Sequence, residues 1–235
     1  MQLKDKVVIV TGASEGLGAA VAKQLAAAGA KLVLASRNAD VLKKMSAELP
    51  GSFVVPTDMR KPADITNLVA KTVAHFGRID IFINNAGQAQ YGPIESVDLA
   101  GYQSIVELNV YGPLRAMQAV IPQMRKQGGG MILNVSSMVS KQYIPNLGSY
   151  ASTKYALNAL SLTAKQELAK DKIVVSVFHP RMTATNFGKN ATGARMFENR
   201  ASAPERNPMP IDSPEAVAEK IIKQIGSEEA ESMMP

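Results

Sequence analysis

Tyr150 and Lys154 stand four residues apart in the stretch "SYASTKYAL", residues 149–157. Residues at this spacing share one face of a helix, so a helical segment would place the phenol one turn from the ammonium. A free phenol has a pKa of about 10, and efficient proton exchange near pH 7 needs a fall of roughly 3 units, worth about 4 kcal/mol. One cation about 5 Å away, at an effective dielectric constant of 20, supplies about 3 kcal/mol. The pair predicts a phenol that exchanges a proton with a substrate oxygen, and an ordinary surface contact is the alternative.

A glycine-rich turn, "VTGASEGLG" at residues 10–18, could hold a phosphate-bearing ligand. Glycines permit a tight turn and let backbone N–H groups approach a pyrophosphate at the start of a helix. The spacing G-x3-G-x-G differs from the G-x-G-x-x-G of the dinucleotide fingerprint, so a plain strand-to-helix turn is the alternative. The residues expected to contact the ligand are Gly12, Ser14, Glu15, Gly16, Leu17 and Gly18.

The elements that would position these residues alternate between short apolar runs and longer stretches of helical period. The strand-like runs are residues 6–10, 31–35, 52–56, 79–84, 131–136 and 173–178. The helical stretches are residues 16–28, 39–49, 62–76, 98–126, 149–170 and 214–225. This alternation predicts an α/β fold with a parallel sheet covered by helices on both faces.

Length and composition narrow the class of protein. A chain of 235 residues with 46% hydrophobic residues suits one large domain that buries a sizeable core. It contains no cysteine and only two distant histidines, which predicts neither disulfides nor a metal site. No apolar stretch is long enough for a signal peptide or a membrane span, so a soluble cytoplasmic protein without a membrane partner is expected. The net charge of +6 is scattered along the chain, which argues against a nucleic-acid partner.

Two further motifs follow strand-like runs, "NNAG" at residues 84–87 and "LNVSS" at residues 133–137. In open α/β sheets, ligands bind beyond the carboxyl ends of the strands. With "TGASEGLG", "LNVYG" and "YASTK", these motifs stand in an order that resembles the short-chain dehydrogenase/reductase family, over roughly residues 5–187.

The resemblance implies a three-layer αβα Rossmann-type fold in one domain, residues 1–235, with strand order 3-2-1-4-5-6. It also implies a catalytic tetrad of Asn109, Ser137, Tyr150 and Lys154. Ser137 would donate to the carbonyl oxygen of the substrate. Asn109 would hold a water that links Lys154 to solvent. The implied reaction is hydride transfer between a nicotinamide cofactor and a carbonyl or secondary alcohol, with Tyr150 as the acid or base.

The end of the second strand favours NADP(H) over NAD(H). An acidic residue there would bind both ribose hydroxyls, whereas an arginine accommodates a 2′-phosphate. Here Ser36 and Arg37 occupy these positions, although Glu15 stands where relatives often carry a basic residue. The resemblance places further cofactor contacts at Asp58, Met59, Asn85, Ala86, Gly87, Tyr150, Lys154, Pro180, Thr183 and Thr185. Arg181 replaces the glycine usual after that proline.

The substrate itself is not readable from the sequence. Its pocket is expected to involve residues 88–91 and a loop region at residues 184–213, with Gln88, Met138, Tyr143 and Phe187 as the candidate contacts. Core packing would explain the same residues.

The C-terminal residues and two long helical stretches lead to expectations about the sheet edge and the oligomeric state. Residues 227–235 are expected to form a frayed tail without the seventh strand that many relatives have. The helical stretches 98–126 and 149–170 match the family's usual dimer surface, so a homodimer or homotetramer is expected.

Three other functions compete with an oxidoreductase. A catalytically silent redox sensor or scaffold would usually lack the tyrosine or the lysine. A nucleic-acid binder would need aromatic interleaving. A longer sugar epimerase would need more chain after residue 190.

Overall fold

The computed structural model describes residues 1–193 and 210–234. Seven parallel strands form its central sheet, in the order β3-β2-β1-β4-β6-β7-β9. The strands are β1 (Val7–Thr11), β2 (Lys31–Ser36), β3 (Phe53–Pro56), β4 (Ile81–Asn84), β6 (Gly130–Val135), β7 (Ile173–His179) and β9 (Glu231–Met233). The first six confirm the predicted strands and their order, where β6 and β7 are the fifth and sixth.

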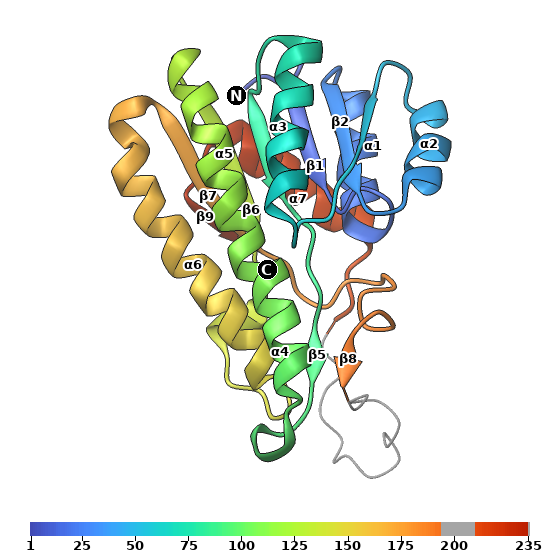
Figure 1. The fold of residues 1–235 in the computed structure, drawn as a ribbon, viewed down its shortest axis with the longest axis vertical. Coiled ribbons are helices and arrows are strands. Elements are labelled where there is room, and N and C mark those ends of the chain that lie inside the picture. The colour runs from blue at the N-terminus through green and yellow to red at the C-terminus, as the bar shows by residue number, and fades with distance from the viewer. Residues whose placement is uncertain (194–209, 235) are drawn as a thin grey trace.

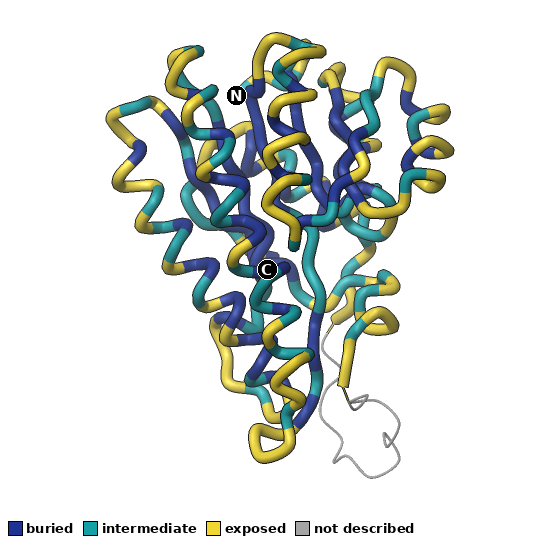
Figure 2. The backbone as a smooth tube through the Cα atoms, in the orientation of Figure 1, coloured by how far each residue is buried: buried dark blue, intermediate teal, exposed yellow. Residues whose placement is uncertain are grey.

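Helices cover both faces of this sheet (Figure 1). One face packs against α1 (Gly16–Ala27), α2 (Ala39–Glu48) and α7 (Pro214–Ser227). The other packs against α3 (Pro62–Phe76), α5 (Gly112–Lys126) and α6 (Gly148–Leu168). Figure 2 shows the inner strands of the sheet in dark blue, buried between these helices. The apolar character of the strands follows from this burial on both faces.

The expectation of a frayed C-terminal tail without a seventh strand is wrong. Residues Glu231–Met233 form β9, which pairs in parallel with β7 at the edge of the sheet. Met234 is buried, and its backbone N–H donates to the carbonyl of His179. The segment is too short and too polar to show a strand pattern, so pairing with β7 and burial of one methionine determine its conformation.

The helix predicted at residues 98–126 is interrupted. It consists of α4 (Leu99–Val106), a π-helical turn at Glu107–Tyr111, and α5. Asn109 lies in this turn and is fully buried. π-Helical turns are rare and occur frequently at functional sites, so this one marks the surroundings of Asn109.

The loop region predicted at residues 184–213 lies partly outside the described residues. Its first part forms β8 (Thr192–Gly193), which pairs with β5 (Gln90–Tyr91). Its last residues lead into α7, whose first turn is capped by the hydroxyl of Ser213. In the part of the chain that the structure describes, no helix is long and apolar enough to span a membrane.

Candidate active site

The glycine-rich turn lies between β1 and α1, at the carboxyl end of the sheet. Gly12 and Gly16 have φ angles of +66° and +55°, which residues with a side chain rarely adopt. A Cβ atom on Gly18 would overlap the carbonyl oxygen of Gly12, so the turn and the helix meet too closely for any larger residue. Asn85, which follows β4, fixes the turn by donating to the carbonyl of Thr11 at 2.9 Å. These features form a cradle of backbone groups at the start of α1.

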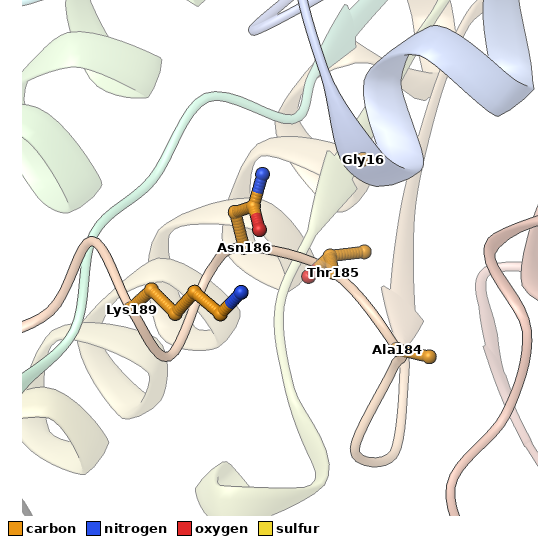
Figure 3. Close-up of a pocket in the computed structure, with 5 residues that line it drawn as sticks. All are labelled: Gly16, Ala184, Thr185, Asn186 and Lys189. Carbon is orange, nitrogen blue, oxygen red and sulfur yellow. The ribbon is translucent and has the colours of Figure 1, made fainter.

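A cavity of about 420 Å³ opens beside this cradle (Figure 3). It is lined by Gly16 and by four residues of one segment after β7, namely Ala184, Thr185, Asn186 and Lys189. A Cβ atom on Gly16 would lie 3.1 Å from the methyl group of Thr185, so the segment passes close over the turn. Thr185 was expected among the cofactor contacts, whereas Asn186 and Lys189 carry no motif and were missed.

A second cavity, of about 230 Å³, lies beyond the ends of β2 and β3. Its lining residues are Arg37, Pro56, Thr57, Asp58, Lys61 and Asp64. The hydroxyl of Ser36 is buried, and it has no hydrogen-bond partner among the described residues. Buried polar groups in proteins are nearly always bonded, so this unpaired hydroxyl is unusual, although Ser36 is not among the residues that line the cavity. The glycine cradle and the second cavity both lie at the carboxyl ends of strands, where ligands bind in open α/β sheets.

Glu15 does not line the second cavity. Its carboxylate accepts hydrogen bonds from the side chains of Asn190, at 3.0 Å, and Asn186, at 3.3 Å. The acidic residue that departs from the usual pattern is therefore engaged by the segment after β7. It leaves Arg37 and Lys61 as the cations that an anion in the second cavity would meet.

Tyr150 and Lys154 lie on one face of α6, as predicted, and both are buried. The Lys154 ammonium donates to the carbonyl of Val135 at 2.9 Å and lies 5.9 Å from the centroid of the Tyr150 ring. Ser137 follows β6, and its hydroxyl is close enough to the Tyr150 phenol to lower the pKa of that group. The structure thus places these three expected catalytic side chains at the carboxyl end of the sheet.

Burial dominates the electrostatics of the pair. It raises the pKa of Tyr150 above that of a free phenol, and the hydrogen bond from Ser137 partly opposes this rise, while nearby Tyr91 adds to it. Burial also lowers the pKa of Lys154 to about 8. This differs from the expectation that the ammonium depresses the phenol's pKa, because both groups lose hydration in the same apolar surroundings. Tyr150 is consequently a protonated donor at neutral pH.

Asn109 is held by backbone and side-chain bonds. Its amide nitrogen donates to the carbonyl of Gln88 at 2.8 Å and to the Thr153 hydroxyl at 3.1 Å. Its amide oxygen accepts from the Gln88 backbone N–H at 3.0 Å. A Cβ atom on Gly87 would lie 3.3 Å from this oxygen and 3.6 Å from the Lys154 ammonium, so Asn109 and Lys154 flank the same glycine.

The other expected cofactor contacts lie around the same edge. The backbone N–H of Ala86 donates to the Thr11 hydroxyl, and Met59 is buried. The carbonyl of Pro180 accepts from Met138. Thr183 forms an isolated bridge with Asp212, and Arg181 binds Asp212 through two hydrogen bonds of 2.9 and 3.1 Å. The arginine therefore fixes the start of the loop region. Ser14 and Leu17 lie in the glycine turn and the first turn of α1 and are partly buried.

The expected substrate residues differ in their surroundings. Phe187 and Gln88 contact other residues of the candidate site, whereas Tyr143 is exposed to solvent. The ring of Phe187 lies 5.7 Å from that of Tyr150, and Gln88 binds the carbonyl of Asn190 and the guanidinium of Arg60. Tyr143, in contrast, is 93% exposed and stacks on Tyr155. Tyr91, at the end of the expected segment 88–91, packs in one cluster with Tyr150 and Phe187.

The chain resembles known proteins over most of its length. Residues 6–195 match the short chain dehydrogenase family. The chain is 33% identical to "Dehydrogenase/reductase SDR family member 7B" of Mus musculus, over 99% of this chain and 74% of that protein. It is 36% identical to an uncharacterized oxidoreductase of Methylorubrum extorquens, over 88% of this chain and 85% of the other.

Solved structures agree with these relatives. An alcohol dehydrogenase from Thermococcus sibiricus, complexed with 5-hydroxy-NADP, superposes with a TM-score of 0.85 at 27% identity, covering 98% of this chain and 96% of that one. A 7α-hydroxysteroid dehydrogenase, complexed with NADH and 7-oxo glycochenodeoxycholic acid, superposes with a TM-score of 0.88 at 26% identity, covering 99% and 93%. The chain belongs to the short-chain dehydrogenase/reductase family of oxidoreductases.

Proposed function

We propose that the protein is an NADP(H)-dependent oxidoreductase that transfers a hydride between the nicotinamide and a carbonyl or secondary alcohol. The observation that carries the proposal is the buried phenol of Tyr150, with the buried Lys154 ammonium 5.9 Å from its ring centroid. When bound, the nicotinamide supplies or accepts the hydride. The chain's own residues must then position the substrate oxygen and exchange a proton with it.

Each of these tasks has a candidate residue. The Ser137 hydroxyl, at the carboxyl end of the sheet, would donate to the substrate oxygen and stabilise negative charge on it. Tyr150 would give its proton to that oxygen during reduction. The Lys154 ammonium would hold the cofactor's ribose and offset charge on the phenolate, and Asn109 would keep the turn that flanks Gly87 in place. Phe187 and Tyr91 add an apolar wall, which favours a substrate with an apolar group beside its carbonyl.

A substrate panel tests this function. Ketones, aldehydes and secondary alcohols of increasing apolar size would be incubated with the protein, and the absorbance of NADPH would be followed. We expect turnover with at least one apolar ketone. Tight NADPH binding without turnover of any compound would instead support a catalytically silent sensor or scaffold.

Cofactor preference provides a sharper prediction. The relatives of known structure carry either NADP-type or NADH ligands, so the preference must come from this chain's own residues. Arg37 and Lys61 both line the cavity beyond β2, and no acidic residue occupies the position of Ser36. This pair of cations supports recognition of a 2′-phosphate. Asp58 and Asp64 line the same cavity, and their carboxylates accept backbone hydrogen bonds from Arg60 and Asp58.

Arg37→Ala is expected to raise the KM for NADPH roughly ten- to a hundredfold, since a hydrogen bond to a charged group is worth about 1.5–3 kcal/mol. The KM for NADH should change little. Lys44→Ala is a matched control, because it removes an exposed cation of α2 that does not line the cavity. Equal losses with both cofactors would contradict the assignment.

We also propose that the protein forms at least a homodimer through α4, α5 and α6. Leu99 and Tyr155 on these helices, and Tyr111 in the π-helical turn, are exposed, as residues at an unpaired interface would be. Light scattering at micromolar concentration is expected to give the mass of a dimer or a tetramer. A purely monomeric mass would contradict the proposal.

A further inference from the structure

His179 is a buried titratable residue that the proposed reaction does not use. It ends β7, and its side chain is fully enclosed. One ring nitrogen, Nε2, lies 2.7 Å from a carboxylate oxygen of Glu231. The other, Nδ1, lies 3.2 Å from the Ser140 hydroxyl and 3.3 Å from the backbone carbonyl of Ser137. The imidazole therefore bridges the C-terminal strand β9 and the expected catalytic serine.

Glu231 is a charged anchor for this bridge. The same carboxylate oxygen accepts from the ammonium of Lys141 at close range, and this bond lowers the pKa of Glu231, with a smaller contribution from His179. The strand that carries Glu231 pairs with β7 in the register that places His179 opposite Met233. An ionised carboxylate only accepts hydrogen bonds, so Nε2 of His179 must carry a hydrogen.

The proton on Nδ1 then determines how the Ser137 carbonyl is bonded. The Ser140 hydroxyl has one hydrogen, which it donates to the Ser137 carbonyl at 2.6 Å, and it accepts from Asn158 at 2.9 Å. A neutral ring leaves Nδ1 as an acceptor that competes for this hydrogen. A protonated ring carries N–H on Nδ1, which donates toward the carbonyl of Ser137. The hydroxyl hydrogen of Ser140 then stays in its bond to that carbonyl.

We infer that His179, held by Glu231, is a positioning residue for Ser137. The inference rests on the proposed function, because it assigns importance to the geometry of that serine. The charged groups that face the ring among the described residues are Glu231 from β9 and Lys141 from the turn after β6. Burial lowers the pKa of His179, hydrogen bonds with Ser137 and Glu231 raise it, and Lys141 lowers it.

Kinetic measurements on two variants test this role. Glu231→Gln and His179→Asn are each expected to lower kcat about tenfold, while the dissociation constant of NADPH stays within twofold of the wild-type value. The kcat–pH profile of the wild type should contain an ionisation below the ordinary histidine value of about 6.5, and His179→Asn should lack it. A positioning role predicts that kcat falls while the affinity for NADPH stays the same. General destabilisation of the fold does not predict this difference.

The control is Ser176→Ala. The Ser176 hydroxyl donates to the carbonyl of Glu229 at 2.7 Å, so it helps dock the segment before β9 without contact to His179. Its loss should lower the thermal midpoint and leave kcat within twofold. If Ser176→Ala reduces kcat as much as Glu231→Gln does, the effect is general loosening of β9 and the inference is wrong.

A double variant tests whether Ser137 is the residue that His179 positions. In Ser137→Ala, the further change His179→Asn should have little effect on kcat, because the group it positions is gone. An undiminished tenfold loss in that background would overturn the inference.

The outcome remains separable from the proposed function. The chain has two histidines, so the ring signals of His179 can be assigned by NMR against His75. Titration of His179 should shift the carbonyl carbon of Ser137 in the wild type and leave it unchanged in His179→Asn. An unresponsive Ser137 carbonyl overturns the inference, whereas a responsive carbonyl in a protein that turns over no substrate overturns only the proposed function.

Discussion

Tyr150→Phe is expected to lower kcat by about 10²–10⁴-fold, the range typical of a lost general acid or base. Burial raises the pKa of the Tyr150 phenol and keeps it protonated at neutral pH, so its proton is available to a substrate oxygen. Phenylalanine keeps the ring and its contact with Phe187, so the affinity for NADPH should remain within a few-fold of the wild-type value. Steady-state kinetics and a fluorescence titration with NADPH measure the two quantities.

Tyr155→Phe is the matched control, because the two tyrosines lie on the same helix. Tyr155 is exposed at its surface and stacks on Tyr143. Removing its hydroxyl should leave kcat unchanged. A Tyr150→Phe enzyme that keeps most of its rate would make Tyr150 a packing residue and remove the basis of the proposed mechanism.

Lys154→Met is expected to abolish most turnover, weaken cofactor binding and yet stabilise the fold at pH 7. The folded-state pKa of Lys154 is about 8, against about 10.4 in an unfolded chain. Between these values the unfolded state binds more protons, so the free energy of unfolding rises with pH in that window. Below pH 8 the buried charge of Lys154 lowers the free energy of unfolding by its full amount, about 3 kcal/mol.

Methionine removes this destabilising charge, but it also removes the hydrogen bond to the carbonyl of Val135, which is worth about 1–2 kcal/mol. The variant should therefore be more stable by about 1–2 kcal/mol at pH 7, and this gain should disappear by about pH 10.5, where Lys154 is neutral in the folded state and about half deprotonated in the unfolded chain. Urea unfolding at pH 7 and about pH 10.5, together with NADPH titration, measures these effects. A variant that is less stable at pH 7 and retains NADPH affinity would contradict both roles.

Much of the fold could be predicted because burial of parallel strands leaves apolar runs that a sequence shows directly. The observed β1, β2 and β7 begin and end within one residue of the predicted runs. β9 could not be predicted, because three residues at a sheet edge carry no period and their pairing with β7 is a tertiary contact. The π-helical turn was also missed, since its apolar pattern is compatible with a continuous helix.

The candidate site shows the same division. Helical spacing predicted that Tyr150 and Lys154 share a face, and the structure places them so. Spacing alone gives no measure of hydration, and burial raises the pKa of the phenol where the ammonium was expected to lower it. The engagement of Glu15 by Asn186 and Asn190 joins residues 171 and 175 positions apart, which no local pattern encodes.

The π-helical turn at Glu107–Tyr111 is a place where the helix could lose one residue and still fold. A π turn holds about one residue more than an α turn, so deleting a single residue there would let the α-helical pattern of α4 continue into α5, except at Pro113 and Pro122, which have no N–H to donate. The same deletion would rotate α4 by about 100° relative to α5 and withdraw Asn109 from Gln88 and Thr153. In a library of single-residue deletions, variants shortened at this turn should still fold but lose catalytic activity.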